Sequence, residues 1–579
     1  MEWQKPKWPQ TLNKMLFHRT SARSRPIHPR DMNKKYEILA ALLLCTGLAS
    51  QAGDIRFEDV NDATGLTPHL KTWRLAHAAS WGDLDADGWP ELYLGAFADP
   101  PRWTEGPLPN MLLRNEQGRR FTLDDQSALQ LKDEHARTSQ VLQADLDQDG
   151  DLDMMVATHP SKRNPFPASL WMNGGDGTFK KADPAKDDGY WPSPMGYRNL
   201  AAVDLNDDGL LDIVACDNNY SNWDDGKGSL LVLVNQGGMR FKDGRAEYGF
   251  PETGTTGLGL AVGDVDDDGR PDFFVADANR LFVSAPDGRY AECQPGLFLQ
   301  PMRRRGKPSK ACGAAFGDLN GDGLLDLATS EHGQHAQTRV YINEGVKDGM
   351  PRFRNATAES GLDGPLPPVG IRGTMVKSGH VAIADFDNDG RRDIWLSVYW
   401  ENAKGQLQPM VYRNEGNTTN ATPRFNRPPY DKVVGYCAPA PIGDFDRDGR
   451  LDGFMAAWFD WDETPSILFR NVTEGGHWLT VRVKGGGKRN TMGVGAVATT
   501  YAPGRGGDPA AFIQRADIVT GTGYSSSEEA LAHLGLGKHE TVDLVIRWGT
   551  ETRKLANVAV DQFLVVDWDA AEKSLDASR

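Results

Sequence analysis

Short apolar stretches alternate with acidic, glycine-containing turns through most of the chain. In each period one apolar run precedes the turn and another follows it, as in residues 258–262 and 326–329. A third run comes next, as in residues 230–235, and a fourth stretch begins with an aromatic residue such as Phe179, Phe241 or Phe353. Short apolar runs bounded by turn residues predict β-strands. Four such strands per period predict the blades of a β-propeller.

The acidic turn recurs seven times with the pattern Asp-x-[Asp/Asn]-x-Asp-Gly-x-x-[Asp/Glu], and successive copies begin 54 to 67 residues apart. Positions 1, 3, 5 and 9 are Asp83, Asp85, Asp87 and Glu91; Asp145, Asp147, Asp149 and Asp153; Asp204, Asn206, Asp208 and Asp212; Asp264, Asp266, Asp268 and Asp272; Asp318, Asn320, Asp322 and Asp326; Asp385, Asp387, Asp389 and Asp393; and Asp444, Asp446, Asp448 and Asp452. Each turn lies between two predicted strands and is predicted to be a hairpin connection. Seven copies predict an all-β fold with a seven-bladed β-propeller.

The spacing within each loop is typical of a calcium site. Oxygen atoms at positions 1, 3 and 5 of a tight turn converge on one point, and a carboxylate at position 9 closes the shell that hard Ca²⁺ requires. The twelfth residue, for example Leu94 or Val156, is never the Glu of an EF-hand. One copy alone is also typical of an ordinary solvated hairpin turn. Seven copies favour up to seven structural calcium ions, with Mg²⁺ a poorer fit.

The two ends of the repeat region differ from its middle. Residues 55–66 match the fourth-strand pattern of residues 353–362, so the N-terminal strand is predicted to complete the seventh blade. After Gly475 the period breaks, and apolar stretches such as 477–483, 493–500, 542–548 and 563–568 predict a small β-sandwich-like domain. We therefore expect a propeller over residues 53–475, a β domain over 476–568 and a tail over 569–579.

The first 52 residues are predicted to be a leader. Residues 32–52 comprise a charged start at Met32, an apolar run over 38–49 and small residues at Ser50 and Ala52, which is the pattern of a secretory signal peptide. The apolar run is shorter than the roughly 17 residues that cross a bilayer. We expect secretion without a stable membrane span after signal cleavage. Whether residues 1–31 are translated, and whether the final compartment is periplasmic, cell-surface or extracellular, stays open.

Charge supports this picture. The chain carries 64 basic and 80 acidic residues, a net charge of −16. The leader is basic with a net charge of +6, so the remainder has −22. An acidic chain is not expected to bind nucleic acid. Secretion would permit disulfides among Cys216, Cys293, Cys312 and Cys437, with Cys293 and Cys312 the nearer pair, and their state stays open.

These motifs resemble known families. The seven loops with their aromatic fourth strands resemble the FG-GAP/VCBS repeats of integrin α-type propellers over about residues 55–472. Residues 521–527, 533–537 and Trp548 resemble the ASPIC/UnbV domain that follows such propellers in cartilage acidic proteins and their bacterial relatives, with Gly549 where that family has Pro. The resemblance implies calcium in the hairpin loops on one face and ligand binding on the opposite face.

Residues before each first strand and after each second strand are expected on the face opposite the loops. The candidates for ligand contact there are Arg74, His77, His135, Arg198, His380, Trp400 and Trp461, within a wider set that includes Arg137, His159 and Trp458. Aromatic plates beside cations and amides suit a glycan or a polar protein segment. The plain alternative is that loops are polar in any case and that these Trp residues cap blades. A zinc site from Glu331, His332 and His335 is a further possibility.

The pattern as a whole favours a secreted, calcium-binding β-propeller that serves as an extracellular binding or adhesion module for a glycan or a protein. The alternative is a secreted polysaccharide lyase or hydrolase that uses the central depression, with His and Arg as general base and charge stabiliser. Residues 525–527 and His533 do not predict a nucleophilic hydrolase, because the strained strand-to-helix elbow is missing.

Overall fold

The computed structural model describes residues 54–71, 73, 75–97, 108–125, 131–133, 135–159, 167–186, 189–191, 197–217, 228–298, 302–303, 307–308, 310–333, 337–364, 376–429, 433–458 and 465–570. Residues 52–579 form one compact unit. The predicted signal peptide lies outside the described residues, as does nearly all of the predicted tail. No helix among the described residues is long and apolar enough to span a membrane.

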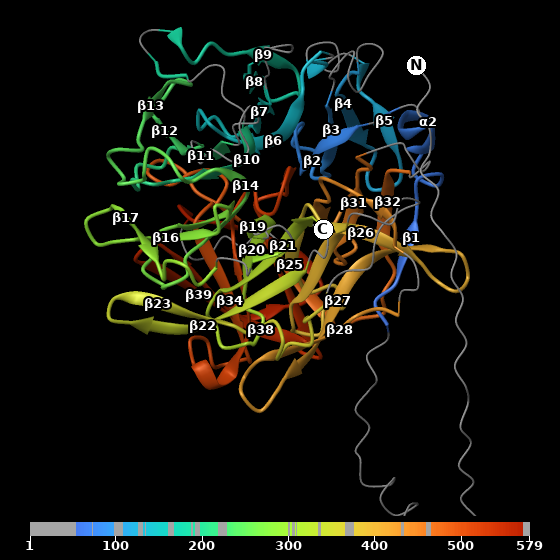
Figure 1. The fold of residues 1–579 in the computed structure, drawn as a ribbon, viewed down its shortest axis with the longest axis vertical. Coiled ribbons are helices and arrows are strands. Elements are labelled where there is room, and N and C mark those ends of the chain that lie inside the picture. Colours follow the sequence, from blue (N-terminus) through green and yellow to red (C-terminus); the bar gives the residue numbers. More distant parts are fainter. Residues whose placement is uncertain are drawn as a thin grey trace, which may run out of the picture. The chain divides into compact units, whose positions relative to one another are not determined.

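Seven antiparallel sheets follow one another along the described part of residues 54–475 (Figure 1). Sheet 1 contains β2 (Ala76–Gly82), β3 (Glu91–Ala96), β4 (Met111–Asn115) and β5 (Phe121–Leu123); sheet 2 contains β6 (Thr138–Ala144), β7 (Asp153–Thr158), β8 (Ser169–Asn173) and β9 (Phe179–Lys181). Sheet 3 contains β10 (Tyr197–Val203), β11 (Asp212–Asp217), β12 (Leu230–Asn235) and β13 (Phe241–Asp243); sheet 4 contains β14 (Gly257–Gly263), β15 (Asp272–Asp277), β16 (Arg280–Ser284) and β17 (Tyr290–Cys293).

The remaining three sheets keep the same order of strands. Sheet 5 contains β20 (Lys310–Gly317), β21 (Asp326–Gly333), β22 (Thr338–Lys347) and β23 (Met350–Asn355), with β24 (Val376–Lys377) beside β21. Sheet 6 contains β25 (Val381–Ala384), β26 (Asp393–Glu401), β27 (Leu407–Asn417) and β28 (Pro423–Asn426), with β29 (Val433–Tyr436) beside β26. Sheet 7 contains β30 (Ile442–Gly443), β31 (Asp452–Met455), β32 (Ile467–Asn471) and β1 (Phe57–Asp59). Outside these sheets lie the short helix α2 (Thr67–Leu70) and the ribbon β18–β19 (Met302–Arg303 and Lys307–Pro308).

The N-terminal strand completes the last sheet, as the sequence predicts. In β1, Phe57 pairs with Asn471 and Asp59 with Phe469 of β32. The two ends of the repeat region are therefore joined by a strand pair about 400 residues apart in sequence. The all-β propeller-type fold is confirmed, and each acidic loop joins the first and second strands of its sheet.

A repeated asparagine links six of the seven sheets to the sheet before it. In six sheets the third strand contains an Asn whose Nδ2 donates to a loop carbonyl of the preceding sheet at 2.7–2.9 Å. These residues are Asn115, Asn173, Asn235, Asn343, Asn414 and Asn471. Asn115 of sheet 1 bonds to Phe445 of sheet 7, so one of these links also joins the two ends of the repeat region. Sheet 4 ends its third strand in Ser284 instead, and it shares with sheet 3 a core that includes Val232 and Leu260.

The C-terminal strands form two facing sheets. One has the order β37 (Ala532–Gly537), β33 (His477–Lys484) and β40 (Gln562–Asp567); the other has the order β35 (Phe512–Asp517), β34 (Ala496–Tyr501), β38 (Thr541–Trp548) and β39 (Glu551–Ala559). Apolar residues of both sheets, such as Val481 and Leu544, belong to one buried cluster that also includes Leu142 and Leu233 of sheets 2 and 3. The C-terminal sandwich therefore packs directly on the propeller sheets.

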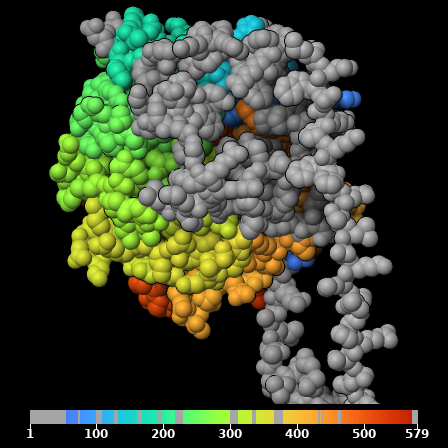
Figure 2. Space-filling view, in the orientation of Figure 1, coloured from blue at the N-terminus to red at the C-terminus, as the bar shows by residue number. Residues whose placement is uncertain are grey.

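On the face seen in Figure 2, sheets 3 to 5 form the green and yellow surface.

Replacing a linking asparagine is predicted to weaken the whole unit. Asn235→Ala removes the donor to the carbonyl oxygens of Leu146 and Leu211, both in buried surroundings. Leaving such groups without a donor costs about 2 kcal/mol of unfolding free energy. Urea unfolding in calcium-containing buffer measures this loss. Asn420→Ala, on an exposed turn, is the control and leaves the unfolding midpoint unchanged. Equal midpoints for the two variants contradict the proposed link.

Candidate functional site

The ninth-position carboxylate ties each acidic loop to the third strand of its own sheet. One oxygen accepts the N–H of the second loop residue, and the other accepts the N–H of the third-strand Asn, or of Ser284 in sheet 4. All fourteen distances lie between 2.7 and 3.4 Å. The same arrangement therefore holds Glu91 in loop 1 and Asp in loops 2 to 7.

The sixth-position glycine shapes the turn. Its N–H donates to the first-position carboxylate at 2.8–3.2 Å in all seven loops. Its φ lies between 82° and 102°, a conformation that side-chain-bearing residues rarely adopt. The loop pattern therefore reflects backbone geometry as well as ligand chemistry.

Carboxylates at positions 1, 3 and 9 converge in five loops. One oxygen of each lies within 4.8 Å of the others in the sets that begin with Asp83, Asp145, Asp264, Asp385 and Asp444. Loops 3 and 5 have Asn206 and Asn320 at position 3, whose amide oxygens are also ligands of the type that hard cations take. Clusters of mostly buried carboxylates that could hold a metal ion are thus a repeated feature of this face.

Several of these carboxylate oxygens accept no hydrogen bond. Such oxygens show whether the loops fit a cation. The buried atoms concerned are Oδ1 of Asp85, Asp145, Asp147, Asp387 and Asp446. At three of the third-position residues an arginine holds the other oxygen, with Arg114 3.0 Å from Asp85, Arg413 2.6 Å from Asp387 and Arg470 2.7 Å from Asp446. A buried carboxylate oxygen without a donor is costly. The donor set and these orphaned atoms fit an oxygen-seeking cation.

The loop carboxyls hold protons strongly when no cation offsets their charge. Burial raises the pKa of Glu91, Asp153 and Asp212 to about 8. Burial, with the neighbouring loop carboxylates as the next cause, also raises the pKa of Asp272 and Asp452 well above the usual range. A bound divalent cation favours the ionised forms and acts against both causes.

The C-terminal sandwich contacts the acidic-loop face. Its side chains bond to first-position carboxylates of four loops: Thr491 to Asp145, Gln514 to Asp385 at 2.9 Å, Arg547 to Asp264 at 2.8 Å, and Arg482 to Asp83 at 3.5 Å. Arg515 also donates to the carbonyl oxygens of Asp264 and Gly323. The face predicted to hold calcium is therefore also the docking surface of the C-terminal sandwich.

Residues 521–527 leave that sandwich and enter the channel that the first strands of the seven sheets surround; we call them the plug. Each sheet, from 1 to 7, contributes a bond: Ala79 N to Ser525 O (3.3 Å), Gln140 Nε2 to Ser526 O (2.9 Å), Asn199 Nδ2 to Gly521 O (2.7 Å), Leu260 N to Gly523 O (3.3 Å), Gly523 N to Ala314 O (2.9 Å), Tyr524 N to His380 Nδ1 (3.2 Å) and Ala440 N to Ser526 Oγ (3.0 Å). Within the plug, β36 (Ser526–Ser527) pairs with β2. The channel is thus filled by the protein's own chain.

At the channel end remote from the loops, aromatic and basic side chains gather around Tyr524. Arg198 Nη1 lies 2.8 Å from His77 Nε2, and the Tyr524 hydroxyl lies 3.1 Å from the same ring nitrogen. Trp458 packs edge-on against His77, with ring centroids 4.4 Å apart. Beside this group the Arg137 guanidinium lies 4.3 Å from the Phe97 ring, which also packs against His159. We call His77, Phe97, Arg137, His159, Arg198, Trp458 and Tyr524 the Arg–aromatic cluster.

The structure brings together only part of the predicted ligand set. His77 and Arg198 meet in the Arg–aromatic cluster, and His380 Nδ1 accepts the backbone N–H of Tyr524. Trp400 bonds Pro409 within its own sheet, His135 is exposed, and Arg74 and Trp461 lie outside the described residues. Sequence reasoning did not select Phe97 and Tyr524. The signal for Phe97 is its place just after a second strand; no local signal places Tyr524 there.

The other candidate chemistry lies only partly within the described residues. Glu331 bonds Arg339 at 2.5 Å, and the side chains of His332 and His335 lie outside the described residues, so the zinc prediction stays untested. The four described cysteines are buried and form no disulfide with one another. Both ring nitrogens of His533 are bonded, to Thr480 and Asn388, so His533 is not placed to act as the base for Ser525–Ser527.

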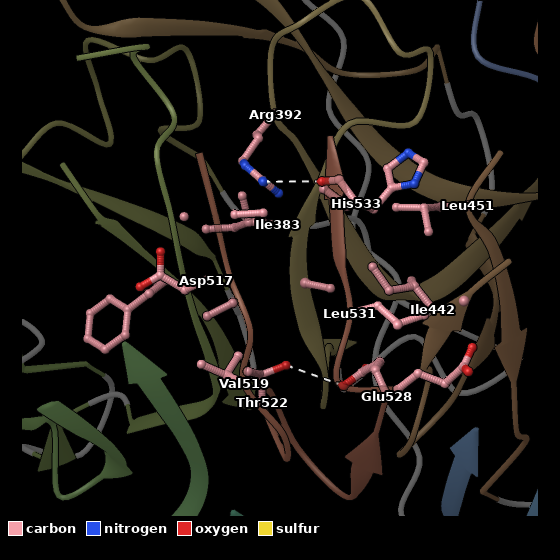
Figure 3. A pocket seen from close by; sticks show the side chains of 18 of the residues that line it. Ile383, Arg392, Ile442, Leu451, Asp517, Val519, Thr522, Glu528, Leu531 and His533 are labelled. Carbon is pink, nitrogen blue, oxygen red and sulfur yellow. Dashed lines mark hydrogen bonds between the residues drawn. The ribbon is translucent and has the colours of Figure 1, made fainter. Parts of the chain in front are cut away.

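A cavity of about 160 Å³ lies where the plug rejoins the sandwich. Figure 3 shows Asp517, Val519 and Thr522 along one side of it and Ile442 and Leu451 along the other. Burial raises the pKa of the lining Glu528 to about 8. The volume is below the roughly 300–1,000 Å³ typical of small-molecule sites, so this cavity suits a few water molecules.

Comparison with known proteins supports the resemblance read from the sequence. A model of the FG-GAP-like repeat matches residues 145–215, 204–275 and 318–396, and a model named ASPIC and UnbV matches residues 486–573. Cartilage acidic protein 1 of Homo sapiens is 23% identical over 517 residues, which cover 84% of this chain and 70% of that protein. The Mus musculus protein of the same name is 23% identical over 539 residues, with coverage of 88% and 75%.

Among solved structures, the six-bladed β-propeller of the Aleuria aurantia lectin aligns with 62% of this chain and 96% of its own, at 12% identity and a TM-score of 0.29. The chain thus contains FG-GAP-like repeats followed by an ASPIC and UnbV segment, and it is similar in sequence to cartilage acidic protein 1.

Proposed function

We propose that the protein is a secreted, calcium-binding β-propeller module that recognises an extracellular glycan or protein at the channel end remote from its acidic loops. The observation that carries the proposal is the Arg–aromatic cluster, in which two guanidinium groups lie among the rings of Phe97, Trp458 and Tyr524. Aromatic faces stack on sugar rings or apolar peptide groups, and guanidinium groups donate fixed hydrogen bonds. Secretion rests on the predicted signal peptide at residues 32–52.

Calcium is proposed for the loops because their ligands are all oxygens and several are orphaned in the absence of a cation. The ion would be structural. The first-position carboxylates also hold the C-terminal sandwich, and the ninth-position carboxylates anchor the third strands. Cation binding at these loops would therefore stabilise both the sheets and the docked sandwich.

The local contacts favour binding over catalysis. An enzyme using this depression needs a free base, yet His77 Nε2 lies 2.8 Å from the Arg198 guanidinium and 3.1 Å from the Tyr524 hydroxyl. Burial, followed by the charge of Arg198, lowers the pKa of His77 well below its usual value. Its Nδ1 lies 3.3 Å from the Ser139 carbonyl and 3.4 Å from the buried Ser525 hydroxyl, so both nitrogens of the neutral ring are in contact with the protein's own groups. We therefore propose a recognition site.

Removal of calcium is predicted to lower the melting temperature by at least about 5 °C. Several sites with extracellular-type affinities each add about 1 kcal/mol or more in millimolar calcium. Differential scanning calorimetry in 2 mM calcium and in excess EDTA measures the change. Readdition of calcium restores the original value, whereas the same concentration of magnesium does not. An identical melting temperature in EDTA shows that the loops are plain turns.

Calcium affinity is predicted to rise with pH between about 6 and 8. Empty loops keep protons on groups such as Asp153 and Asp212, whose pKa burial raises to about 8, and a cation requires the ionised forms. Binding at pH 7 therefore releases protons. Titration calorimetry in two buffers of different ionisation enthalpy counts the protons. Equal apparent enthalpies in the two buffers mean that no proton leaves and contradict this linkage.

Ligand recognition is predicted to depend on the Arg–aromatic cluster. Trp458→Ala removes a partly exposed ring that packs against His77 and Phe97. Binding to the preferred glycan of a glycan array is expected to fall at least about tenfold, because a stacking plate is lost. Trp89→Ala, the same change beside loop 1 on the opposite face, is the matched control. No binding by the unaltered protein removes the glycan proposal, and an array of extracellular protein domains then tests the protein alternative.

A further inference from the structure

The geometry points to Tyr524 as a residue of the recognition site that the C-terminal sandwich supplies through the channel. We infer that Tyr524 positions the His77–Arg198 pair, so that the site is complete only when the sandwich is docked on the acidic-loop face. That this site binds a ligand rests on the proposed function, whereas the positioning role of Tyr524 does not.

Hydrogen bonds and burial hold the plug in the channel. It exchanges hydrogen bonds with the first-strand region of all seven sheets, through residues such as Ala79, Leu260 and Ala440. Ser525, Ser526 and Ser527 are fully buried, and Tyr524 is only 5% exposed. The plug is therefore a permanent part of the channel wall around the site.

The path of the plug requires two glycines. Gly521 has a φ of 67°, and a Cβ there would lie 1.8 Å from the Leu200 carbonyl oxygen. Gly523 has a φ of 77°, and a Cβ there would lie 2.2 Å from Nδ1 of His380. Both the dihedral angle and the space exclude a side chain. This tight fit fixes the position of Tyr524 along the channel.

Tyr524 makes contacts that hold the pair in place. Its hydroxyl lies 3.1 Å from His77 Nε2 and 3.4 Å from Arg198 Nη1. Its ring packs edge-on against the His77 ring and belongs to a small buried cluster with Leu258 and Cys312, against which Trp458 packs. Removal of the hydroxyl takes away one contact of each member of the pair and leaves the apolar packing unchanged.

Both flanks of the plug are bound to acidic loops. Before it, Gln514 bonds Asp385 and Arg515 bonds Asp267. After it, Glu529 forms a two-bond ion pair with Arg447 of loop 7, at 2.8 Å for each bond. The plug is thus a strut between the acidic loops and the Arg–aromatic cluster. The position of Tyr524 depends on the docking of the sandwich at both of these flanks.

The test compares Tyr524→Phe and Gly523→Ala in the calcium-loaded protein. Matched controls in the same sandwich are Tyr501→Phe, outside the channel, and Gly504→Ala, which has a φ of 74° but nothing within 4 Å of an added Cβ. Hydrogen exchange is followed in peptides that cover residues 76–82, 197–203, 257–263 and 519–531. Binding to the preferred array glycan is measured in parallel.

Gly523→Ala is expected to raise exchange at least about tenfold in the plug and at Ala79 and Leu260, whose amides donate to it. Tyr524→Phe is expected to raise exchange over residues 76–82 and 197–203 with the plug still protected, and to weaken glycan binding about tenfold. Unchanged exchange over those two strands in Tyr524→Phe overturns the inference. If exchange rises as expected but the unaltered protein binds no glycan, the positioning role holds and only the proposed glycan ligand fails.

Discussion

The rest of the structure depends on the two hydrogen bonds that the buried ninth-position carboxylate of each acidic loop accepts. With two oxygens it accepts one N–H from its own loop and one from the third strand. In six sheets that third-strand residue is the asparagine whose side chain bonds the preceding sheet. In those six periods, one carboxylate therefore joins the strands within a sheet, and one asparagine side chain joins that sheet to the preceding one. A buried carboxyl is stable there only with these donors or with a proton or cation nearby.

The channel presents a second constraint. The first strand of each sheet has one edge that pairs with the second strand and one edge that faces the centre. Backbone N–H and C=O groups on those inner edges require partners when they are buried. The plug supplies such partners at sheets 1, 4, 5 and 7, bonds side chains of sheets 2, 3 and 6, and uses two glycines to fit. The C-terminal sandwich is therefore more than an appended module, because it completes the hydrogen bonding of the propeller centre.

Charge distribution explains why the sandwich docks where it does. The loops gather carboxylates on one face, and Arg482, Arg515 and Arg547 of the sandwich point to that face. Each arginine offsets part of the carboxylate repulsion, and the orphaned oxygens that remain are those that suit a cation. The two ends of the channel consequently differ in character. The acidic end binds the sandwich, and the other end gathers guanidinium groups and rings around Tyr524.

The sequence by itself determined the strands, the seven hairpin loops and the closure by the N-terminal strand, because each follows from the pattern of strands and turns that repeats along the chain. It also grouped His77, Arg198 and His380 on one face, since strand alternation and loop position are local properties. Only the tertiary structure decided that these residues meet Tyr524, and that residues 521–527 fill the channel. Those contacts join segments more than 100 residues apart, and up to 447 apart for His77 and Tyr524. No short-range pattern encodes them, because they arise from the fit of one irregular segment into a space that all seven sheets create together.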